Sequence, residues 1–311
     1  MRIAVVIPCY RVKKHIRSVL ETLPDFVEGI YLVDDCCPEE STYEIDKKYE
    51  RVKVIKNIVN MGVGGAVKRG YVEALKDNFE IVVKIDGDGQ MSGRDIAKLI
   101  GPIINKRADY TKGNRFMRFE NIKSMPLIRL FGNAALSFIT KFSTGYWNVA
   151  DPTNGFTAIR TSVLAEIPLN KISNRYFFES DMLFRLGMIS AVVNDVPLKT
   201  VYKDEISNLK IRNIIFEFAY KNLKNYIKRI LYFYYIKDLN IASFNLPLGI
   251  FLSIFGLSYG IGNWIYSQNQ GIATPTGIIM ICMTSVMVGI QLLLSFINFD
   301  INSTPKLPIS D

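Results

Sequence analysis

Histidine and cysteine are scarce in this sequence, which has one histidine (His15) and four cysteines among 311 residues. A single histidine argues against Ser-His-Asp triads and excludes multi-histidine zinc sites and the HExxH motif. The cysteines show neither CxxC spacing nor a plausible disulfide ladder, which favours a reducing, cytosolic compartment. They are Cys9, Cys36, Cys37 and Cys282. Any metal in this protein must therefore be held by oxygen ligands.

Charged residues are missing between Asp238 and Asp300, where 61 consecutive residues include no Asp, Glu, Lys or Arg, although these types make up 22% of the chain. Such a run is typical of membrane segments. A polar turn at Ser267 to Pro275 divides it into two predicted spans, Leu246 to Tyr266 and Thr276 to Phe299, each close to the ~20 residues of one crossing. The alternatives are a re-entrant hairpin and a pair of core helices in a soluble protein.

The net charge is +9, and the positive excess lies before the uncharged run. From Ile211 to Tyr235 apolar residues recur at helical spacing, which predicts a basic amphipathic helix in the lipid headgroup layer. A helix packed on the globular domain is the alternative. The positive-inside rule places residues 1–238 in the cytoplasm. No zinc, RNP or helix-turn-helix pattern accompanies the charge, so anionic lipid explains it better than nucleic acid. The basic face of the helix carries Lys221, Lys224, Lys228 and Arg229.

From Ile3 to about Val196, short apolar runs alternate with longer amphipathic runs, as in βαβ units on a mostly parallel sheet. The first run, Ile3 to Ile7, is too short for a signal peptide and is expected to be the first strand. Ligands of such sheets bind at the carboxyl ends of the strands, where polar residues collect here. The other predicted strands are Gly29 to Val33, Val52 to Ile55, Ile81 to Ile85 and Asp109 to Lys112. The predicted helices are Lys13 to Leu23, Ser41 to Tyr49, Val63 to Lys76 and Asp95 to Ile104.

Two carboxylates, Asp86 and Asp88, follow the strand that begins at Ile81, and Gln90 stands two residues further on. Carboxylates one residue apart at a strand end can share one divalent cation, and Gln90 can add a neutral oxygen. Hard oxygen ligands suit Mg2+ or Mn2+, which usually also bind phosphate oxygens. The alternative is a solvated Asp-Gly turn.

A glycine-rich stretch from Asn60 to Gly70 opens a predicted helix and contains Lys68 and Arg69. Accessible backbone N–H groups at such a helix start can bind an anion, so a phosphate is expected here. Asp35, at the end of the second strand, can accept a hydrogen bond from a nucleobase N–H or a ribose hydroxyl. Helix capping is the competing role for this carboxylate.

Taken together, these motifs resemble the family 2 glycosyltransferases of GT-A fold, and among them the polyprenyl-phosphate sugar synthases of the dolichol-phosphate mannose synthase and bactoprenol glucosyltransferase type. The resemblance covers residues 3 to about 210. The early matching segments are Val5 to Tyr10, Val33 to Asp35, Asn60 to Gly70 and Asp86 to Gln90. The later ones are Gly113 to Phe116, Asp151 to Phe156 and Phe177 to Arg185.

The resemblance implies a role for each matching position. Pro8, Tyr10 and Asp35 would hold the base and ribose of a nucleotide sugar. Lys68 would face its phosphates, and Asp86, Asp88 and Gln90 would hold the metal on its diphosphate. Arg115 and Arg129 would contact an acceptor phosphate, and Asp181 would lie near the reacting sugar. Asp181, Asp88 and Arg115 are therefore the expected catalytic residues. The sequence departs from the family pattern at Arg11 and Val12, and at Asp181, where a glutamate is usual.

The predicted organisation is a cytoplasmic GT-A domain (1–210), an interfacial helix (211–238), a transmembrane hairpin (239–300) and a cytoplasmic tail (301–311). The leading hypothesis is an inverting, metal-dependent transfer of a sugar from a UDP- or GDP-sugar to a polyprenyl phosphate at the inner membrane, with a possible homo-oligomer. A phosphate acceptor needs positioning cations such as Arg115 and Arg129. Transfer to a hydroxyl of a membrane glycan, with Asp181 as base, is the alternative. An inactive scaffold subunit is the third possibility.

Overall fold

The computed structural model of the chain describes residues 1–43, 45, 49–117, 127–198 and 211–309, without the side chains of 127–131, 133 and 211–215. These residues form two compact units, one of Met1–Tyr226 with Pro305–Asp311 and one of Ile227–Thr304. The division between the units falls within a long helix. The four-part organisation expected from the sequence stays a prediction.

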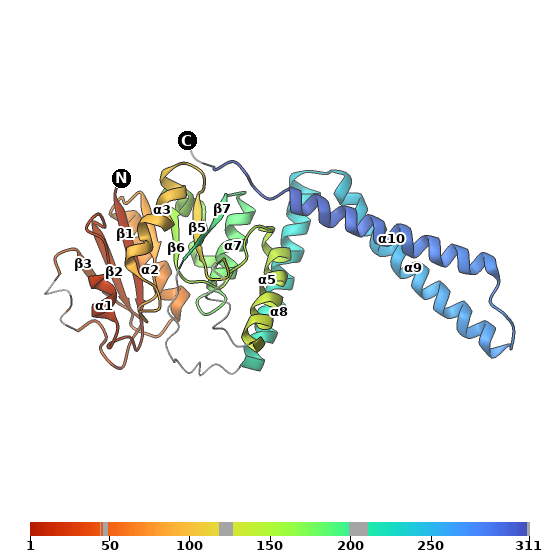
Figure 1. Cartoon of the computed structure of the whole chain (residues 1–311), viewed down its shortest axis with the longest axis horizontal. Helices are drawn as coiled ribbons and strands as arrows, with labels where there is room; N and C mark the ends of the chain where they lie inside the picture. Colours follow the sequence, from red (N-terminus) through yellow and green to blue (C-terminus); the bar gives the residue numbers. More distant parts are fainter. Residues whose placement is uncertain (44, 46–48, 118–126, 199–210, 310–311) are drawn as a thin grey trace. The chain divides into compact units, whose positions relative to one another are not determined.

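In the described part of the first unit, seven strands form one sheet in the order β3-β2-β1-β4-β6-β5-β7 (Figure 1). Neighbours pair in parallel except β6, which runs antiparallel to both β4 and β5. The mostly parallel sheet predicted from the sequence is confirmed. The strands are β1 (Ile3–Cys9), β2 (Gly29–Asp34), β3 (Val52–Lys56), β4 (Ile81–Lys84), β5 (Tyr110–Asn114), β6 (Thr157–Arg160) and β7 (Val193–Pro197).

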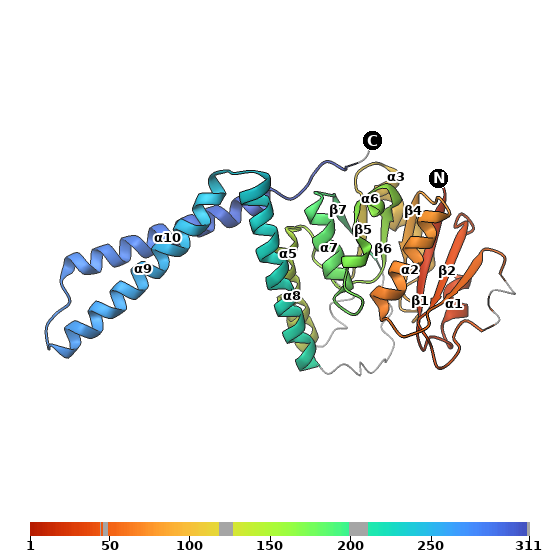
Figure 2. The ribbon, with the colours of Figure 1, turned by 180° about the vertical axis from the view of Figure 1, so that it is seen from behind.

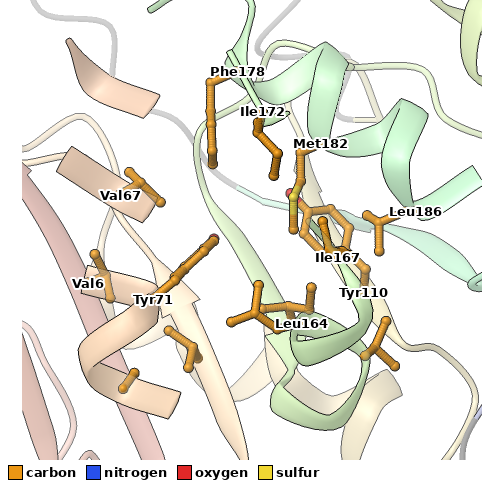
Figure 3. Packing of buried hydrophobic residues seen from close by; sticks show 14 of the residues in the cluster. Val6, Val67, Tyr71, Tyr110, Leu164, Ile167, Ile172, Phe178, Met182 and Leu186 are labelled. Atoms are coloured by element: carbon orange, nitrogen blue, oxygen red, sulfur yellow. The ribbon is translucent and has the colours of Figure 1, made fainter. Parts of the chain in front are cut away.

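Helices cover both faces of this sheet, which is why the central strand β1 is apolar along its whole length. Successive side chains of a strand point to opposite faces. Ala4 and Val6 of β1 therefore pack with helices α2, α6 and α7, whereas Val5 and Ile7 pack with α1 and α3. Figure 3 shows the first of these cores. The helices of this unit are α1 (Ile16–Glu21), α2 (Val63–Lys76), α3 (Ile96–Ile104), α5 (Leu127–Thr144), α6 (Thr161–Glu166), α7 (Phe178–Met188) and most of α8 (Ile211–Leu231), with short 3-10 helices at Gly93–Asp95 and Leu169–Lys171.

The helix predicted at Ser41 to Tyr49 is wrong for the described residues 41–43 and 45, which form turns. The Thr42 hydroxyl donates to Asp34 Oδ2 at 2.8 Å, and the Ser41 hydroxyl accepts from Val12 N at 3.1 Å. Such local side-chain hydrogen bonds compete with helix formation. The last predicted strand lies slightly later than expected, because Asp109 precedes β5.

One face of α8 packs on the first unit, as the alternative to an interfacial helix predicts for this part of the chain. Phe218 lies edge-on against Phe177, with ring centroids 5.1 Å apart. The Ser143 hydroxyl donates to Asn222 Oδ1 at 2.6 Å, and both side chains are buried. Packing and hydrogen bonds thus fix residues 218–225 of α8 to the globular unit.

The opposite face of α8 is apolar and exposed. Phe216, Tyr220 and Leu223 are 68%, 67% and 57% exposed, respectively. Their spacing of four and three residues places them on one side of the helix, opposite the buried Phe218, Asn222 and Asn225. This part of α8 therefore has one face packed against the unit and an exposed apolar face on the opposite side.

The second unit contains two helices that are long and apolar enough to cross a membrane, α9 (Ile241–Asn269) and α10 (Thr276–Asn302). They lie side by side in both views (Figures 1 and 2). At Gly289 a Cβ would lie 2.7 Å from Ser253 N and 3.0 Å from Gly249 O, so glycine lets the two backbones approach closely. A π-helix, Tyr232–Lys237, precedes α9. The two apolar helices predicted from the sequence are confirmed; α9 extends a few residues beyond both predicted ends, and α10 starts at the predicted Thr276 and extends to Asn302.

A buried ion pair joins the two ends of the second unit. Arg229 donates to the Asp300 carboxylate at 2.7 and 3.0 Å, and the Tyr234 hydroxyl donates to the same group at 2.6 Å. Asp300 is 2% exposed. The end of α10 is thus tied to the segment that leads into α9.

Candidate active site

A cavity of about 460 Å³ lies at the carboxyl ends of β1, β2 and β4, where the sequence predicts a ligand crevice. Three short loops and the start of α2 form most of its wall, and a segment before α7 completes it. It is lined by Pro8, Cys9, Tyr10, Val12, Asp35, Asn60, Gly62, Val63, Ala66, Asp86, Gly87, Asp88, Arg175 and Tyr176.

The structure brings together about half of the predicted site residues. Pro8, Tyr10, Asp35, Asp86 and Asp88 line the cavity. Lys68, Gln90, Arg115 and Asp181 do not line it, and the side chain of Arg129 lies outside the described residues.

Asp35 is 2% exposed, and hydrogen bonds occupy both of its carboxylate oxygens. Oδ1 accepts from Asn57 Nδ2 and from Met61 N, each at 2.8 Å, and Oδ2 accepts from Gly62 N at 2.7 Å. Gly62 is the N-cap of α2. The carboxylate therefore performs the capping role that competes with base binding, and contact with a base stays a prediction.

Asp86 is held by a lysine that sequence reasoning missed. Lys84 Nζ lies 2.9 Å from Asp86 Oδ1 and 2.8 Å from Glu179 Oε1, and the lysine side chain is 1% exposed. Burial alone would lower the pKa of Lys84, but the two carboxylates outweigh it and raise the pKa above its ordinary value. The signal in the sequence was a lysine inside an otherwise apolar strand.

A second buried lysine, Lys112 of β5, lies close to this group. Its ammonium donates to the carbonyl oxygen of Asn154. Burial lowers the pKa of Lys112 to about 8, against weaker opposing effects of Glu179 and Asp151. Lys112 therefore adds a second buried basic group that interacts with Glu179 and Lys84.

Asp86 and Asp88 fit a divalent cation whose remaining ligands would come from the substrate. No group of three His, Cys, Asp or Glu side chains able to hold a metal occurs in the described part of the chain. Mg2+ commonly binds one or two carboxylates together with water and substrate phosphates, and two carboxylates on a cavity wall match that donor set. Gln90 contributes its backbone, because Gln90 N donates to Asp88 Oδ1 at 3.0 Å.

Backbone N–H groups at the glycine-rich start of α2 donate to oxygen atoms of the protein, whereas the sequence predicts that they bind an anion. Met61 N and Gly62 N donate to Asp35, and Gly65 N donates to Asn174 O at 2.9 Å. Lys68 Nζ donates to Ile172 O at 2.7 Å and to the side chain of Asn174. These hydrogen bonds do not favour the expected phosphate contacts of Lys68 and of the glycine-rich backbone.

Arg115 is also bound within the protein. Its Nε and one terminal nitrogen donate to Asp151 at 2.7 and 2.8 Å, and Asp151 is fully buried. This two-bond pairing is the strongest geometry available to a guanidinium. The pairing neutralises the positive charge of Arg115, which the sequence predicts to contact an acceptor phosphate.

Asp181 lies in α7 and is 5% exposed. Its Oδ2 accepts from Ser173 N at 2.8 Å, and its Oδ1 accepts from Asn225 Nδ2 at 3.4 Å. The carboxylate thus holds the chain next to the cavity. The predicted contact with the reacting sugar stays a prediction.

Sequence reasoning missed two residues of the cavity wall, Arg175 and Tyr176, both exposed. They precede α7 in sequence, far from the strand-end motifs. The distance along the chain gives no signal that they join Asp86 and Asp88.

A family model described as "Glycosyl transferase family 2" matches residues 4–168, more than half of the chain. The chain is a family 2 glycosyltransferase. The GT-A resemblance predicted from the sequence is therefore confirmed, and the protein is an enzyme of this class.

Curated relatives of this glycosyltransferase are named for lipid-linked acceptors. A UDP-N-acetylglucosamine–dolichyl-phosphate N-acetylglucosaminyltransferase of Methanococcus voltae is 34% identical over 65% of this chain and 86% of the relative. A dolichol-phosphate mannosyltransferase of Pyrococcus furiosus is 30% identical over 58% and 52%, respectively. An undecaprenyl-phosphate mannosyltransferase of Micrococcus luteus is 26% identical over 66% and 85%.

Solved structures support the GT-A fold. Glucosyl-3-phosphoglycerate synthase of Mycobacterium tuberculosis, solved with Mn2+, UDP and glucosyl-3-phosphoglycerate, superposes with a TM-score of 0.53 at 17% identity, covering 73% of this chain and 79% of that one. A structure of the same enzyme with Mg2+ and UDP gives a TM-score of 0.54. At this identity the likeness establishes the fold alone.

Proposed function

We propose that this glycosyltransferase transfers a sugar from a UDP- or GDP-linked donor to a polyprenyl phosphate. The observation that carries the proposal is a cavity with two carboxylates, Asp86 and Asp88, on its wall, in a chain that also has two helices able to cross a membrane. Three relatives named for dolichyl or undecaprenyl phosphate support the acceptor class.

The donor would bind with Mg2+ or Mn2+ held by Asp86 and Asp88. Such an ion supplies positive charge to the departing diphosphate. Lys84 Nζ, 2.9 Å from Asp86 Oδ1, keeps that carboxylate in place. The solved neighbours contain Mn2+ or Mg2+ together with UDP, which supports the choice of ion.

The reaction is a single displacement at the anomeric carbon. An acceptor phosphate oxygen forms the new C–O bond while the C–O bond to the nucleoside diphosphate breaks, and that diphosphate leaves with the electron pair. Attack from the opposite face inverts the anomeric centre. The acceptor phosphate is already ionised at pH 7, so no proton has to move.

A hydroxyl acceptor would instead need a general base at the reacting atoms. Asp181 was the expected base, but it lies outside the cavity wall and accepts hydrogen bonds from Ser173 and Asn225. This arrangement favours the phosphate acceptor.

The exposed face of α8 supports action at a lipid surface. Phe216, Tyr220 and Leu223 present apolar area, and the same helix carries the exposed Lys224 and Lys228. A helix with an apolar face and flanking lysines is suited to the headgroup layer of an anionic leaflet. We place this leaflet on the cytoplasmic side of the inner membrane, with α9 and α10 as its transmembrane hairpin, because the lysine-rich side precedes the first span. Labelling of the exposed Cys36 by an impermeant maleimide in inside-out but not right-side-out vesicles tests the side.

A transfer assay tests the function. The purified full chain is incubated with Mn2+ or Mg2+, radiolabelled UDP- and GDP-sugars, and undecaprenyl phosphate in lipid vesicles, and label in the organic phase is counted. Lipid label that requires the metal and disappears in Asp88→Ala is expected. Asp25→Ala, at a fully exposed position outside the cavity, is the matched control. Donor binding without lipid label from any sugar would overturn the proposal.

A further inference from the structure

Arg175 brings the positive charge to the cavity wall. Among the described residues that line the cavity it is the basic one, and the acidic ones are Asp35, Asp86 and Asp88. Its side chain is exposed, and its guanidinium makes no hydrogen bond or ion pair with another described residue. A guanidinium in this state is suited to bind a phosphate through two parallel hydrogen bonds.

Hydrogen bonds hold the segment that carries Arg175, residues 172–176, at four of its five residues. Lys68 Nζ donates to Ile172 O at 2.7 Å and to the Asn174 side chain. Asp181 Oδ2 accepts from Ser173 N at 2.8 Å. Phe178 N donates to Arg175 O at 2.9 Å, which joins the segment to the start of α7. The backbone of Arg175 is therefore set before any ligand binds.

Glycines at the start of α2 make room for this segment. A Cβ on Gly62 would lie 2.8 Å from Asn174 O and 2.9 Å from Arg175 Cγ. A Cβ on Gly64 would lie 2.5 Å from Ser173 O. The 172–176 segment consequently lies directly over the start of α2, where the sequence predicts a phosphate.

The charges around the cavity call for a further cation. One divalent ion on Asp86 and Asp88 would be balanced by these two carboxylates, and the buried Lys84 is balanced by Glu179. The diphosphate of a nucleotide sugar, which gains charge as the sugar leaves, would then need a positive group besides the metal ion. Lys68 does not supply it, because its ammonium is bonded to Ile172 and Asn174.

We propose that Arg175 binds the diphosphate of the nucleotide sugar, and that Lys68 is a positioning residue that acts by holding the 172–176 segment. The proposal rests on the proposed function for the identity of the ligand. It assigns to Arg175 the contact that the sequence assigns to Lys68.

Nucleotide affinity tests the first part. Binding of UDP and GDP, each with Mn2+ and without acceptor, is measured by calorimetry on the detergent-solubilised full chain. Arg175→Ala is expected to weaken the nucleotide that wild type binds by about 10- to 100-fold, the effect of losing a charge-assisted pair of hydrogen bonds. Arg94→Ala, at an exposed arginine outside the cavity, should leave the Kd unchanged. An unchanged Kd in Arg175→Ala would overturn the proposal.

A double-mutant cycle tests the second part. Lys68→Met should weaken nucleotide binding in the wild-type background and have little further effect when Arg175 is already alanine. Lys68→Arg should recover part of the loss, because a guanidinium can still donate to the segment. Fully additive effects of Lys68→Met and Arg175→Ala would mean that Lys68 contacts the phosphates itself, and would overturn its positioning role.

A kinetic measurement shows whether Arg175 binds the phosphates of the nucleotide or the phosphate of the acceptor. If Arg175→Ala leaves nucleotide affinity intact and raises only the KM for undecaprenyl phosphate, the guanidinium binds the acceptor and the proposal fails. Wild type that binds neither UDP nor GDP with Mn2+ would overturn both this proposal and the proposed function. Wild type that binds nucleotide but transfers nothing to lipid would overturn the acceptor alone.

Discussion

Lys84 shows how a buried charge can serve a cavity that it does not line. Its ammonium is 1% exposed, so it has lost nearly all hydration, and the carboxylates of Asp86 and Glu179 replace that hydration at 2.9 and 2.8 Å. Breaking such a pair from one side leaves an uncompensated charge, which costs more than the pair itself contributes. Glu179 is therefore coupled through Lys84 to the orientation of Asp86.

Replacing Lys84 with methionine is expected to destabilise the protein by about 3–5 kcal/mol, because the buried Glu179 and the partly buried Asp86 lose their shared partner. The rate of sugar transfer should fall as well, because Asp86 loses the ion pair that holds its carboxylate. The free energy of unfolding in detergent and the donor KM are the measurements. Lys98→Met removes an exposed lysine paired with Asp95 and should cost at most about 1 kcal/mol. A Lys84→Met protein with wild-type stability and KM would contradict this account.

A substitution at Gly155 tests the close packing around Lys84 and Asp86. A Cβ there would lie 2.5 Å from Lys84 Nζ and would also collide with the Asp86 carboxylate. Gly155→Ala is expected to cost about 1–3 kcal/mol from overpacking and to lower metal-dependent nucleotide affinity. Gly101→Ala, where a Cβ meets nothing within 4 Å, should be neutral or stabilise the helix α3 by up to about 1 kcal/mol. Equal behaviour of the two variants would argue against the crowding seen at Gly155.

Residues near the strand ends could be predicted from the sequence because a motif places them there whatever the loops do. Asp86 and Asp88 follow an apolar strand directly, and both line the cavity. Arg175 could not be predicted, because its position depends on how the 172–176 segment crosses the start of α2. Neither could the pairing of Arg115, since Asp151 approaches it from 36 residues further along the chain.

At the scale of elements, α2 was predicted with its observed bounds, Val63–Lys76, because a glycine start and regular apolar spacing mark it. The stretch after β2 was not, because the hydroxyls of Ser41 and Thr42 bond to Val12 and Asp34. β6 and β7 escaped prediction as well. Polar residues interrupt the apolar run of each strand, Thr157 and Arg160 in β6 and Asn194 and Asp195 in β7.

The two faces of α8 lead to a prediction at this scale. The joint replacement of Phe216, Tyr220 and Leu223 by serine should leave the thermal midpoint unchanged, because all three are exposed. Transfer to undecaprenyl phosphate in vesicles should fall by about fivefold or more, while transfer to a short water-soluble isoprenyl phosphate should not. Ile58→Ser, at a 92% exposed position, is the control. Equal loss with both acceptors would contradict a role at the lipid surface.

At the scale of the whole molecule, the Arg229–Asp300 pair closes the second unit. Asp300→Asn leaves a buried guanidinium facing a neutral amide and is expected to cost about 3 kcal/mol. Unfolding of the full chain in detergent by heat or SDS measures this. Asp238→Asn, at an exposed aspartate in the same unit, should change stability by less than about 0.5 kcal/mol. If the two variants unfold alike, the ion pair does not hold the unit together.

The central claim is that a lipid phosphate attacks the sugar. The most direct measurement compares undecaprenyl phosphate with undecaprenol in matched vesicles, counting nucleoside diphosphate released and sugar incorporated into lipid. The account predicts one diphosphate per lipid-linked sugar with the phosphate and no transfer with the alcohol. Equal transfer to undecaprenol, or sugar incorporated only into a glycan hydroxyl, would contradict it.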